Sequence, residues 1–226
     1  FNNHGVDALI ANVKRAKFQG VLGINIGKNA TTPIENAVDD YLTCLTKVYD
    51  HASYITVNIS SPNTKNLRAL QSEDELSKLL GTLKEEQARL QQQRGRYVPM
   101  AVKIAPDLNL EEIEAIAQVV TQVEMDGVIA TNTTIDKSSL GNHPLAGEAG
   151  GLSGLPVRAQ SEYVLQHLVH ALKGKLPVIG VGGIVAGQDA ATKKRLGASA
   201  VQVYSGMIYQ GPSLVADCVR EWVHTR

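Results

Sequence analysis

The stretch Gly20-Val21-Leu22-Gly23-Ile24-Asn25-Ile26 is a short, nearly continuous apolar run that follows a segment with helical spacing. In that preceding segment Val6, Leu9, Ile10 and Val13 recur at intervals of three and four residues, which predicts an amphipathic helix. A strand that is apolar throughout is typical of a parallel sheet covered by helices, because such a sheet is buried on both faces. The stretch therefore indicates one strand of a parallel α/β fold.

The same alternation of helix and strand continues to the end of the chain. Further strands are predicted over residues 54–59, 98–104, 127–130, 177–181 and 199–204. Further helices are predicted over 34–49, 76–83, 113–123, 164–172, 190–196 and 212–222. Thr32 with Glu35, and Ser72 with Glu75, have the spacing of capping boxes at two helix starts.

Six strands and seven helices in alternation predict an α/β protein with a (β/α)8 barrel fold, from which about two βα units are absent. An open, doubly wound sheet is the alternative. No linker divides the chain, so residues 1–226 are expected to form one domain. Because the chain opens with a helix and starts at Phe1, we expect it to be incomplete at its N-terminus.

The composition restricts the kinds of partner. There are 22 basic and 22 acidic side chains in 226 residues, so no net positive charge is available to hold a nucleic acid, and none is expected as a partner. No apolar run approaches the roughly 20 residues of a membrane helix. Cys44 and Cys218 have no metal-binding spacing, and His167 and His170 have no acidic neighbour, so we expect no metal site.

Polar side chains follow the predicted strands where a parallel barrel places its functional groups. Lys103 interrupts an apolar strand, and the neighbouring strand ends supply amides and hydroxyls, which favours a ligand's negative charge over a buried carboxylate as its partner. Asn25 and Asn58 suit the carbonyl and NH edge of a heterocycle, or satisfy loop backbone. Gly182-Gly183 suits a phosphate, or forms a tight turn. The long glycine-rich loop from Asn132 to Leu155 suits a mobile active-site segment.

Six of these motifs, in this order and each near a strand end, together resemble the dihydroorotate dehydrogenases of the membrane-associated, quinone-reducing class. They are Asn58-Ile59-Ser60-Ser61-Pro62-Asn63-Thr64, Val102-Lys103-Ile104-Ala105-Pro106-Asp107, Ala130-Thr131-Asn132-Thr133-Thr134, Gly150-Gly151-Leu152-Ser153-Gly154, Gly180-Val181-Gly182-Gly183 and Val203-Tyr204-Ser205-Gly206. The resemblance implies an FMN-containing (β/α)8 barrel that oxidises (S)-dihydroorotate to orotate in pyrimidine (UMP) biosynthesis. Electrons would pass through the flavin to ubiquinone or menaquinone.

The resemblance also implies roles for individual residues. Ser61 would be the catalytic base that removes the C5 proton, with Thr64 and a water as a proton relay, and a serine here rather than a cysteine indicates the quinone-using class. Pyrimidine-binding residues would be Phe1, Asn58, Asn63, Asn132 and Thr133. FMN-binding residues would be Asn25, Asn58, Lys103, Thr131, Gly154, Gly183, Tyr204 and Ser205, with Lys103 near N1 and O2 of the flavin ring.

The resemblance also implies a location in the cell, and two other functions remain as alternatives to the dehydrogenase. Members of this class attach peripherally to the cytoplasmic side of the inner membrane through an N-terminal extension that is not in this chain. The other functions considered are a different FMN- or phosphate-binding barrel oxidoreductase, such as a dihydropyrimidine dehydrogenase-like module, and a catalytically silent fragment.

Overall fold

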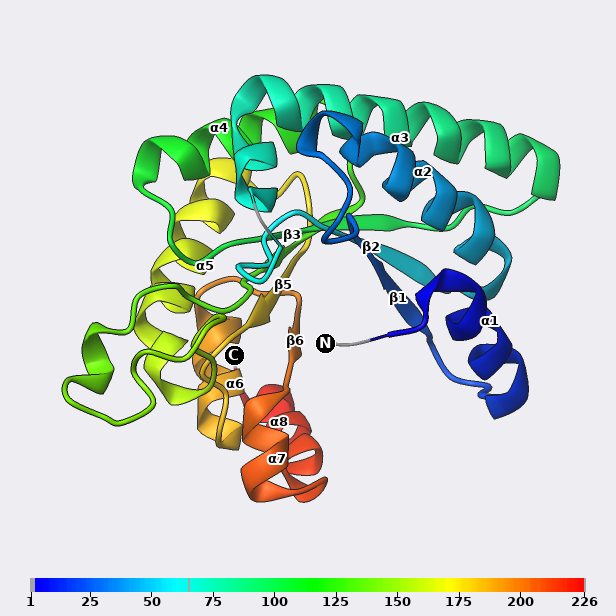
Figure 1. Cartoon of the computed structure of the whole chain (residues 1–226). Helices are drawn as coiled ribbons and strands as arrows, with labels where there is room; N and C mark the ends of the chain where they lie inside the picture. The colour runs from blue at the N-terminus through cyan, green and yellow to red at the C-terminus, as the bar shows by residue number, and fades with distance from the viewer. Residues whose placement is uncertain (1–2, 65, 226) are drawn as a thin grey trace.

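The computed structural model describes residues 3–64 and 66–225. One parallel sheet of six strands runs in strict chain order, so each strand pairs with the next in the sequence. The strands are β1 (Gly23–Ile26), β2 (Tyr54–Asn58), β3 (Met100–Ile104), β4 (Gly127–Ala130), β5 (Val178–Val181) and β6 (Ala200–Gln202). This order is that of a barrel wall and not of a doubly wound sheet. Figure 1 shows the sheet curved into an open half-barrel with helices along its outer side.

The helices confirm the predicted alternation. They are α1 (Gly5–Ala16), α2 (Ala37–Val48), α3 (Glu73–Arg94), α4 (Leu110–Gln122), α5 (Arg158–Leu172), α6 (Gly187–Arg195), α7 (Ser205–Gln210) and α8 (Ser213–His224). Short 3-10 turns occur at Ile34–Asn36, Tyr49–His51, Leu67–Gln71, Ser138–Leu140 and Leu155–Val157. All seven predicted helices are present, and α7 is an addition that the sequence patterns did not predict.

The capping boxes predicted at Thr32 and Ser72 are wrong, because neither side chain makes a capping hydrogen bond. The Thr32–Glu35 segment leads into a 3-10 turn that starts at Ile34 after Pro33, and α2 itself begins later, at Ala37. Ser72 does occupy the N-cap position of α3, but its side chain makes no capping hydrogen bond. A capping box forms instead at α4, where the Asn109 side chain accepts from the Glu112 backbone N–H.

The hydrophobic core lies between the sheet and the outer helices. Tyr41 and Leu45 of α2 pack there with Ile55 and Val57 of β2, all with no exposed surface. At β1 only one face is buried: Ile24 and Ile26 are covered by helices, whereas Gly23 and Asn25 are exposed on the inner side of the barrel. The expectation of strands buried on both faces is therefore wrong for β1 and also for β6, where Ala200 is exposed, and these are the two end strands of the described sheet.

A tyrosine crosses the inner side of the half-barrel. The ring of Tyr54 lies close to Gly23, where a Cβ atom would stand 2.2 Å from a ring carbon. Its hydroxyl oxygen accepts a hydrogen bond of 3.4 Å from the side chain of Gln202 on β6, 148 residues away. This bond connects β2 with the far end of the sheet.

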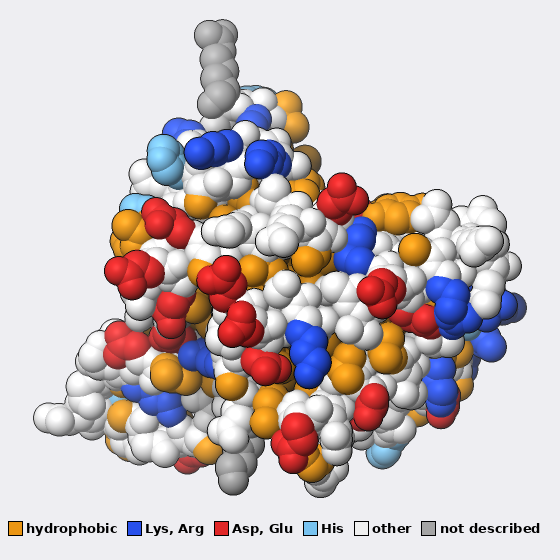
Figure 2. Space-filling model, turned by 90° about the horizontal axis from the view of Figure 1, so that it is seen from above, with side chains coloured by type: hydrophobic (Ala, Val, Ile, Leu, Met, Phe, Trp, Pro, Cys, Tyr) orange, Lys and Arg blue, Asp and Glu red, His pale blue; other side chains and the backbone are white. Residues whose placement is uncertain are grey.

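On the face seen from above in Figure 2, acidic and basic side chains are interspersed, in keeping with the balanced composition. None of the described helices is long and apolar enough to cross a membrane.

Candidate active site

The carboxyl ends of β2, β3 and β4 bring together side chains that are far apart in the sequence. The Asn132 amide donates to Oδ1 of Asn58 at 3.2 Å and to the Ser60 hydroxyl oxygen at 3.1 Å. The buried Ser60 hydroxyl in turn donates to the Lys103 carbonyl at 2.7 Å. Tyr41 fixes the same strand end from the helix layer, since its hydroxyl donates to the Asn58 carbonyl at 2.7 Å. Two predicted pyrimidine-binding asparagines thus share one hydrogen-bonded cluster.

Lys103 lies beside Asn58 in the sheet register and is half-buried. Within residues 3–64 and 66–225 no carboxylate lies within 4.0 Å of its ammonium group, and burial lowers the pKa of that group. The alternative of a buried carboxylate partner is therefore not found in the described structure. The arrangement leaves a cation available to an anionic ligand.

Ser61 lies in the loop that follows β2, and its hydroxyl oxygen accepts a hydrogen bond of 3.3 Å from the Asn63 backbone N–H. Arg68 holds this loop against its neighbours. Its guanidinium donates to the Ser60 carbonyl at 3.2 Å, to the Thr133 carbonyl at 2.9 Å and to Asp107 at 2.8 Å. Arg68 therefore ties together the loops after β2, β3 and β4.

Asp107 is the second residue of this network. Besides the ion pair with Arg68, its carboxylate accepts from the Thr134 hydroxyl and, at 3.2 Å, from the Ile135 backbone N–H. Asp107 belongs to one of the sequence motifs, but no role was predicted for it. No sequence pattern distinguishes Arg68 from surface arginines. Periodicity could not have found either residue, because their partners come from other loops.

The glycine-rich loop between Asn132 and Leu155 is anchored over the site. Thr134 and Leu152 form a two-way backbone bridge, with N–H to O distances of 3.0 and 2.7 Å. A Cβ at Gly151 would stand 2.0 Å from Oγ1 of Thr133, and one at Gly150 would stand 2.9 Å from Oδ1 of Asn63. Glycine is therefore required where this loop contacts predicted pyrimidine-binding residues.

At the ends of β5 and β6, several predicted cofactor-binding residues approach one another. The Ser205 hydroxyl donates to the Ser153 hydroxyl at 2.8 Å, and Gly154 lies against the Ser205 side chain. Gly182 and Gly183 have φ values of 111° and 74°, in the left-handed region. In the described part of the chain the backbone N–H groups of Gly183 and Ile184 have no hydrogen-bond acceptor. Such a pair of free donors suits an anion.

The remaining predicted site residues are placed as follows. Thr131 is buried and donates to the Asn132 carbonyl at 3.0 Å, Asn25 is exposed on the inner side of β1, and Tyr204 is exposed just before α7. Phe1 lies outside the described residues. The predicted site residues thus line the carboxyl edge of the half-barrel from β1 to β6.

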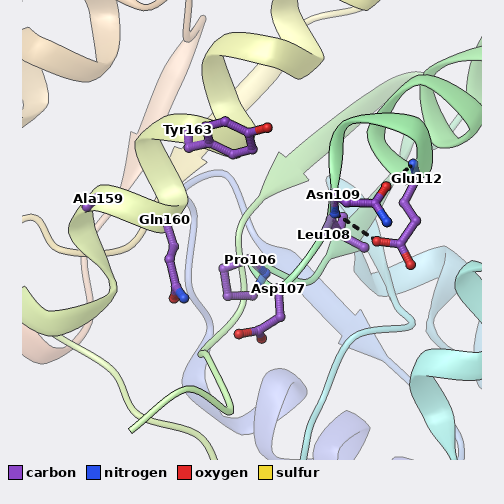
Figure 3. A pocket seen from close by; sticks show the side chains of 8 residues that line it. All are labelled: Pro106, Asp107, Leu108, Asn109, Glu112, Ala159, Gln160 and Tyr163. Carbon is purple, nitrogen blue, oxygen red and sulfur yellow. Dashed lines mark hydrogen bonds between the residues drawn. The ribbon is translucent and has the colours of Figure 1, made fainter. Parts of the chain in front are cut away.

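A separate pocket of about 580 Å³ lies between the loop after β3 and the start of α5 (Figure 3). Asp107, Asn109 and Glu112 line one side and Gln160 and Tyr163 the other. None of the predicted site residues lines it. Asp107 therefore lines this pocket and is also connected, through Arg68, with the loops that carry Ser60 and Thr133.

The curved parallel sheet, with amides, hydroxyls and a lysine at the carboxyl ends of its strands, defines an α/β-barrel protein, and the candidate site lies where such barrels place theirs. The family model described as dihydroorotate dehydrogenase matches residues 1–225. The chain therefore belongs to the dihydroorotate dehydrogenase family, as its motifs predicted.

Individual relatives agree with this assignment. The chain is 70% identical over 220 residues to a dihydroorotate dehydrogenase (quinone) of Neisseria meningitidis serogroup C, covering 97% of this chain and 66% of the relative. It is 64% identical to the protein of the same name from Chromobacterium violaceum, of which it covers 64%. The crystal structure of the Eimeria tenella dihydroorotate dehydrogenase in complex with ferulenol superposes with a TM-score of 0.88 at 36% identity, covering 98% of this chain and 65% of that one. The chain thus spans about two thirds of the length of the curated relatives it matches, and the six-stranded half-barrel corresponds to part of their barrel.

Proposed function

We propose that the protein catalyses the oxidation of (S)-dihydroorotate to orotate, with FMN as hydride acceptor and a quinone as the final electron acceptor. The observation that carries the proposal is the Asn58–Ser60–Asn132 hydrogen-bonded cluster, which Ser61 directly follows in a loop held by Arg68. Relatives up to 70% identical are named dihydroorotate dehydrogenase (quinone), which supports the same reaction. On this proposal residues 1–226 are part of the FMN-binding catalytic barrel domain.

The residues present fit an FMN group. Lys103 offers a cation without a carboxylate partner in the described structure, and Gly183 and Ile184 offer two free backbone donors to a phosphate. The residues that would hold the cofactor are Asn25, Asn58, Lys103, Thr131, Gly154, Gly183, Tyr204 and Ser205. When bound, the flavin would accept the hydride that leaves C6 of the substrate.

The chain's own residues would bind the substrate and take its proton. Asn58, Asn63, Asn132 and Thr133 offer amides and a hydroxyl that match the carbonyl and NH groups of a pyrimidine, and Phe1 is proposed as a further contact. Ser61 would take the C5 proton. Because a free hydroxyl is a weak base, it must pass that proton on at once, and the Thr64 hydroxyl with a water is the proposed relay.

Lys103 would act by electrostatics. Its ammonium would lie beside N1 and O2 of the flavin ring, where negative charge accumulates on reduction. Because this lysine is half-buried, its charge is screened less than that of a surface lysine. This accounts for a cation within an otherwise apolar strand.

The electron acceptor and the location form the second part of the proposal. Ubiquinone or menaquinone would reoxidise the flavin, in line with the names of the relatives. Peripheral contact with the inner (cytoplasmic) membrane on its cytoplasmic side would bring the protein to its quinone. Steady-state assays with a short-chain ubiquinone, fumarate and NAD in parallel test this: turnover with fumarate or NAD, but not with quinone, would assign the protein to another class.

The reaction itself is tested by anaerobic mixing of the FMN-loaded protein with dihydroorotate while flavin absorbance is followed. Bleaching of the flavin with formation of one orotate per flavin is expected. Bound flavin that stays oxidised would favour a different flavin-binding barrel oxidoreductase, and a preparation that binds no flavin would favour the catalytically silent fragment.

A further inference from the structure

Lys193 of α6 lies outside the predicted site, and its side chain is entirely buried. Its aliphatic stem packs on Gly180 of β5, where a Cβ would stand 3.0 Å from Cδ of the lysine. Its ammonium group donates to the Ser161 hydroxyl oxygen at 2.8 Å, and no carboxylate of the described chain lies within 4.0 Å of it. A buried ammonium with one neutral partner is costly, so the position calls for a function that outweighs this cost.

Ser161 continues the contact toward the end of β5. Its hydroxyl oxygen lies 2.9 Å from the Arg158 carbonyl and 3.1 Å from the Gly182 carbonyl. Because an ammonium group can only donate, Ser161 accepts from Lys193 and shares its single proton between these two carbonyls. The hydrogen bonds therefore run from Lys193 through Ser161 to the backbone carbonyls of Arg158 and Gly182.

Arg158 fixes the next carbonyl along the loop. Its Nε donates to the Gly183 carbonyl at 3.0 Å, while its Nη2 is held by Asp189 at 2.7 Å. In a trans peptide the C=O and the following N–H point in opposite directions. Two consecutive carbonyls drawn toward α5 therefore turn the N–H groups of Gly183 and Ile184 away from it. Figure 1 shows α5 and α6 on the outer side of β5, from which both anchors act.

We propose that Lys193 is a positioning residue for the phosphate group of the flavin nucleotide: through Ser161 it orients the Gly182–Gly183 peptide, and its buried charge favours the phosphate dianion. The inference rests on the proposed function and extends it to a residue outside the predicted contact set. Lys193 would not touch the phosphate, because the Gly182 peptide lies between them in the hydrogen-bond chain.

The titration of Lys193 gives a further readout. Burial lowers the pKa of the ammonium group to about 8, while Glu162 and Asp189 act in the opposite direction and Arg158 adds to the lowering. A bound phosphate dianion would favour the protonated lysine, so FMN binding would be coupled to proton uptake above pH 8. The affinity for FMN should therefore fall as the pH rises above about 8, and this part of the pH dependence should be absent when Lys193 is replaced by an apolar residue.

The test compares FMN with riboflavin, which carries the same ring without the phosphate. Dissociation constants are measured by quenching of flavin fluorescence for the wild type, Lys193→Met, Ser161→Ala and Lys194→Met. The last is the matched control, since Lys194 is the next residue on α6 and donates instead to the Trp222 and Thr225 carbonyls. Lys193→Met and Ser161→Ala should weaken FMN binding roughly 10-fold to 100-fold, as expected for one charge-assisted interaction. Riboflavin binding should change less than about twofold in every variant, because no phosphate is involved.

Equal loss of FMN and riboflavin in Lys193→Met, or a fall in its thermal midpoint, would show that the lysine merely supports the fold and would overturn the inference. FMN binding at wild-type strength in Ser161→Ala would overturn the route through the hydroxyl. A wild-type protein that binds neither flavin would overturn the proposed function together with this inference.

Discussion

At the scale of single residues, Ser61 offers the most direct test of the mechanism. We expect Ser61→Ala to keep FMN affinity and to slow flavin reduction by dihydroorotate by roughly 10²-fold to 10⁴-fold, the usual effect of a lost general base. Its hydroxyl accepts only from the Asn63 backbone among the described residues, so the loop held by Arg68 should survive the change. Stopped-flow absorbance gives the rate. Ser61→Cys, the matched variant, should retain more activity, and near wild-type bleaching in Ser61→Ala would remove Ser61 from the mechanism.

Lys193 predicts an effect on stability that is independent of flavin. The pKa of its ammonium is about 8 in the folded chain and near 10.5 when unfolded, so below pH 8 the buried charge opposes folding by on the order of 1 to 3 kcal/mol. Between pH 8 and 10.5 the unfolded chain binds more protons than the folded one, so this cost disappears as the pH rises. Lys193→Met should therefore raise the free energy of unfolding of flavin-free protein at pH 7, by less at pH 9. Urea titrations at both pH values measure it, and a gain that grows with pH would contradict the argument.

Sequence patterns could predict those site residues whose chemistry contrasts with their neighbours. Lys103 stands out in an apolar strand, and Asn58 and Asn132 stand out at strand ends. Arg68 and Lys193 do not stand out, because long basic side chains are ordinary on helices and loops and only the folded chain shows what surrounds them. Their roles depend on partners from other elements, which no local pattern records.

At the scale of elements, two helix starts with similar residues should respond differently to the same change. Asn109→Ala should lower the free energy of unfolding by about 1 kcal/mol, since it removes the side-chain acceptor of the α4 capping box. Ser72→Ala is the matched control and should cost much less, because its side chain makes no capping hydrogen bond. Denaturant unfolding of both variants measures the difference. Equal losses would mean that the capping geometry does not decide the stability of these helix starts.

The loop network centred on Arg68 predicts a coupled loss of stability and substrate affinity. Arg68→Met would leave Asp107 without its ion-pair partner and should cost roughly 1 to 3 kcal/mol, because both side chains are largely buried. It should also raise the KM for dihydroorotate, since the Thr133 carbonyl loses its anchor. Arg220→Met breaks an exposed pair with Asp217 and should leave both quantities nearly unchanged. Thermal unfolding measures the stability and steady-state kinetics measure the KM. An unchanged KM in Arg68→Met would show that the loop network does not affect substrate binding.

The existence of elements was easier to predict than their ends. All six strands were found from apolar runs, since burial on the sheet requires such runs. The helix α7 was missed because six residues give no helical period. The predicted end of α3 at Leu83 was too early, because the second half of this helix, which ends at Arg94, is largely polar and offers little periodicity. The capping signals at Thr32 and Ser72 failed because the hydrogen bonds depend on how the preceding loop enters the helix.

At the scale of the whole molecule, β1 and β6 are end strands with one neighbour each in the described sheet. We expect the 226-residue chain on its own to associate with increasing concentration, because free strand edges pair readily and the inner face exposes Ala200 and the surface beside Asn25. Light scattering after size exclusion measures this. Ala200→Lys should reduce the association by placing a charge at the β6 edge, and a wild-type chain that stays monomeric over the same range would show that both edges are protected.

The strictly sequential strand order also bears on how the chain folds. Each βα unit can dock on the edge of the unit before it as soon as it leaves the ribosome, so the sheet can grow in one direction with modest loop closures. The hydrogen bond between Tyr54 and Gln202 is different, because it joins residues 148 positions apart. Contacts of such separation add to the contact order and cannot form until the last strand is in place. We therefore expect the ring NMR signals of Tyr54 to reach their native values in the final folding phase, after the β2–β3 pairing beside it has formed.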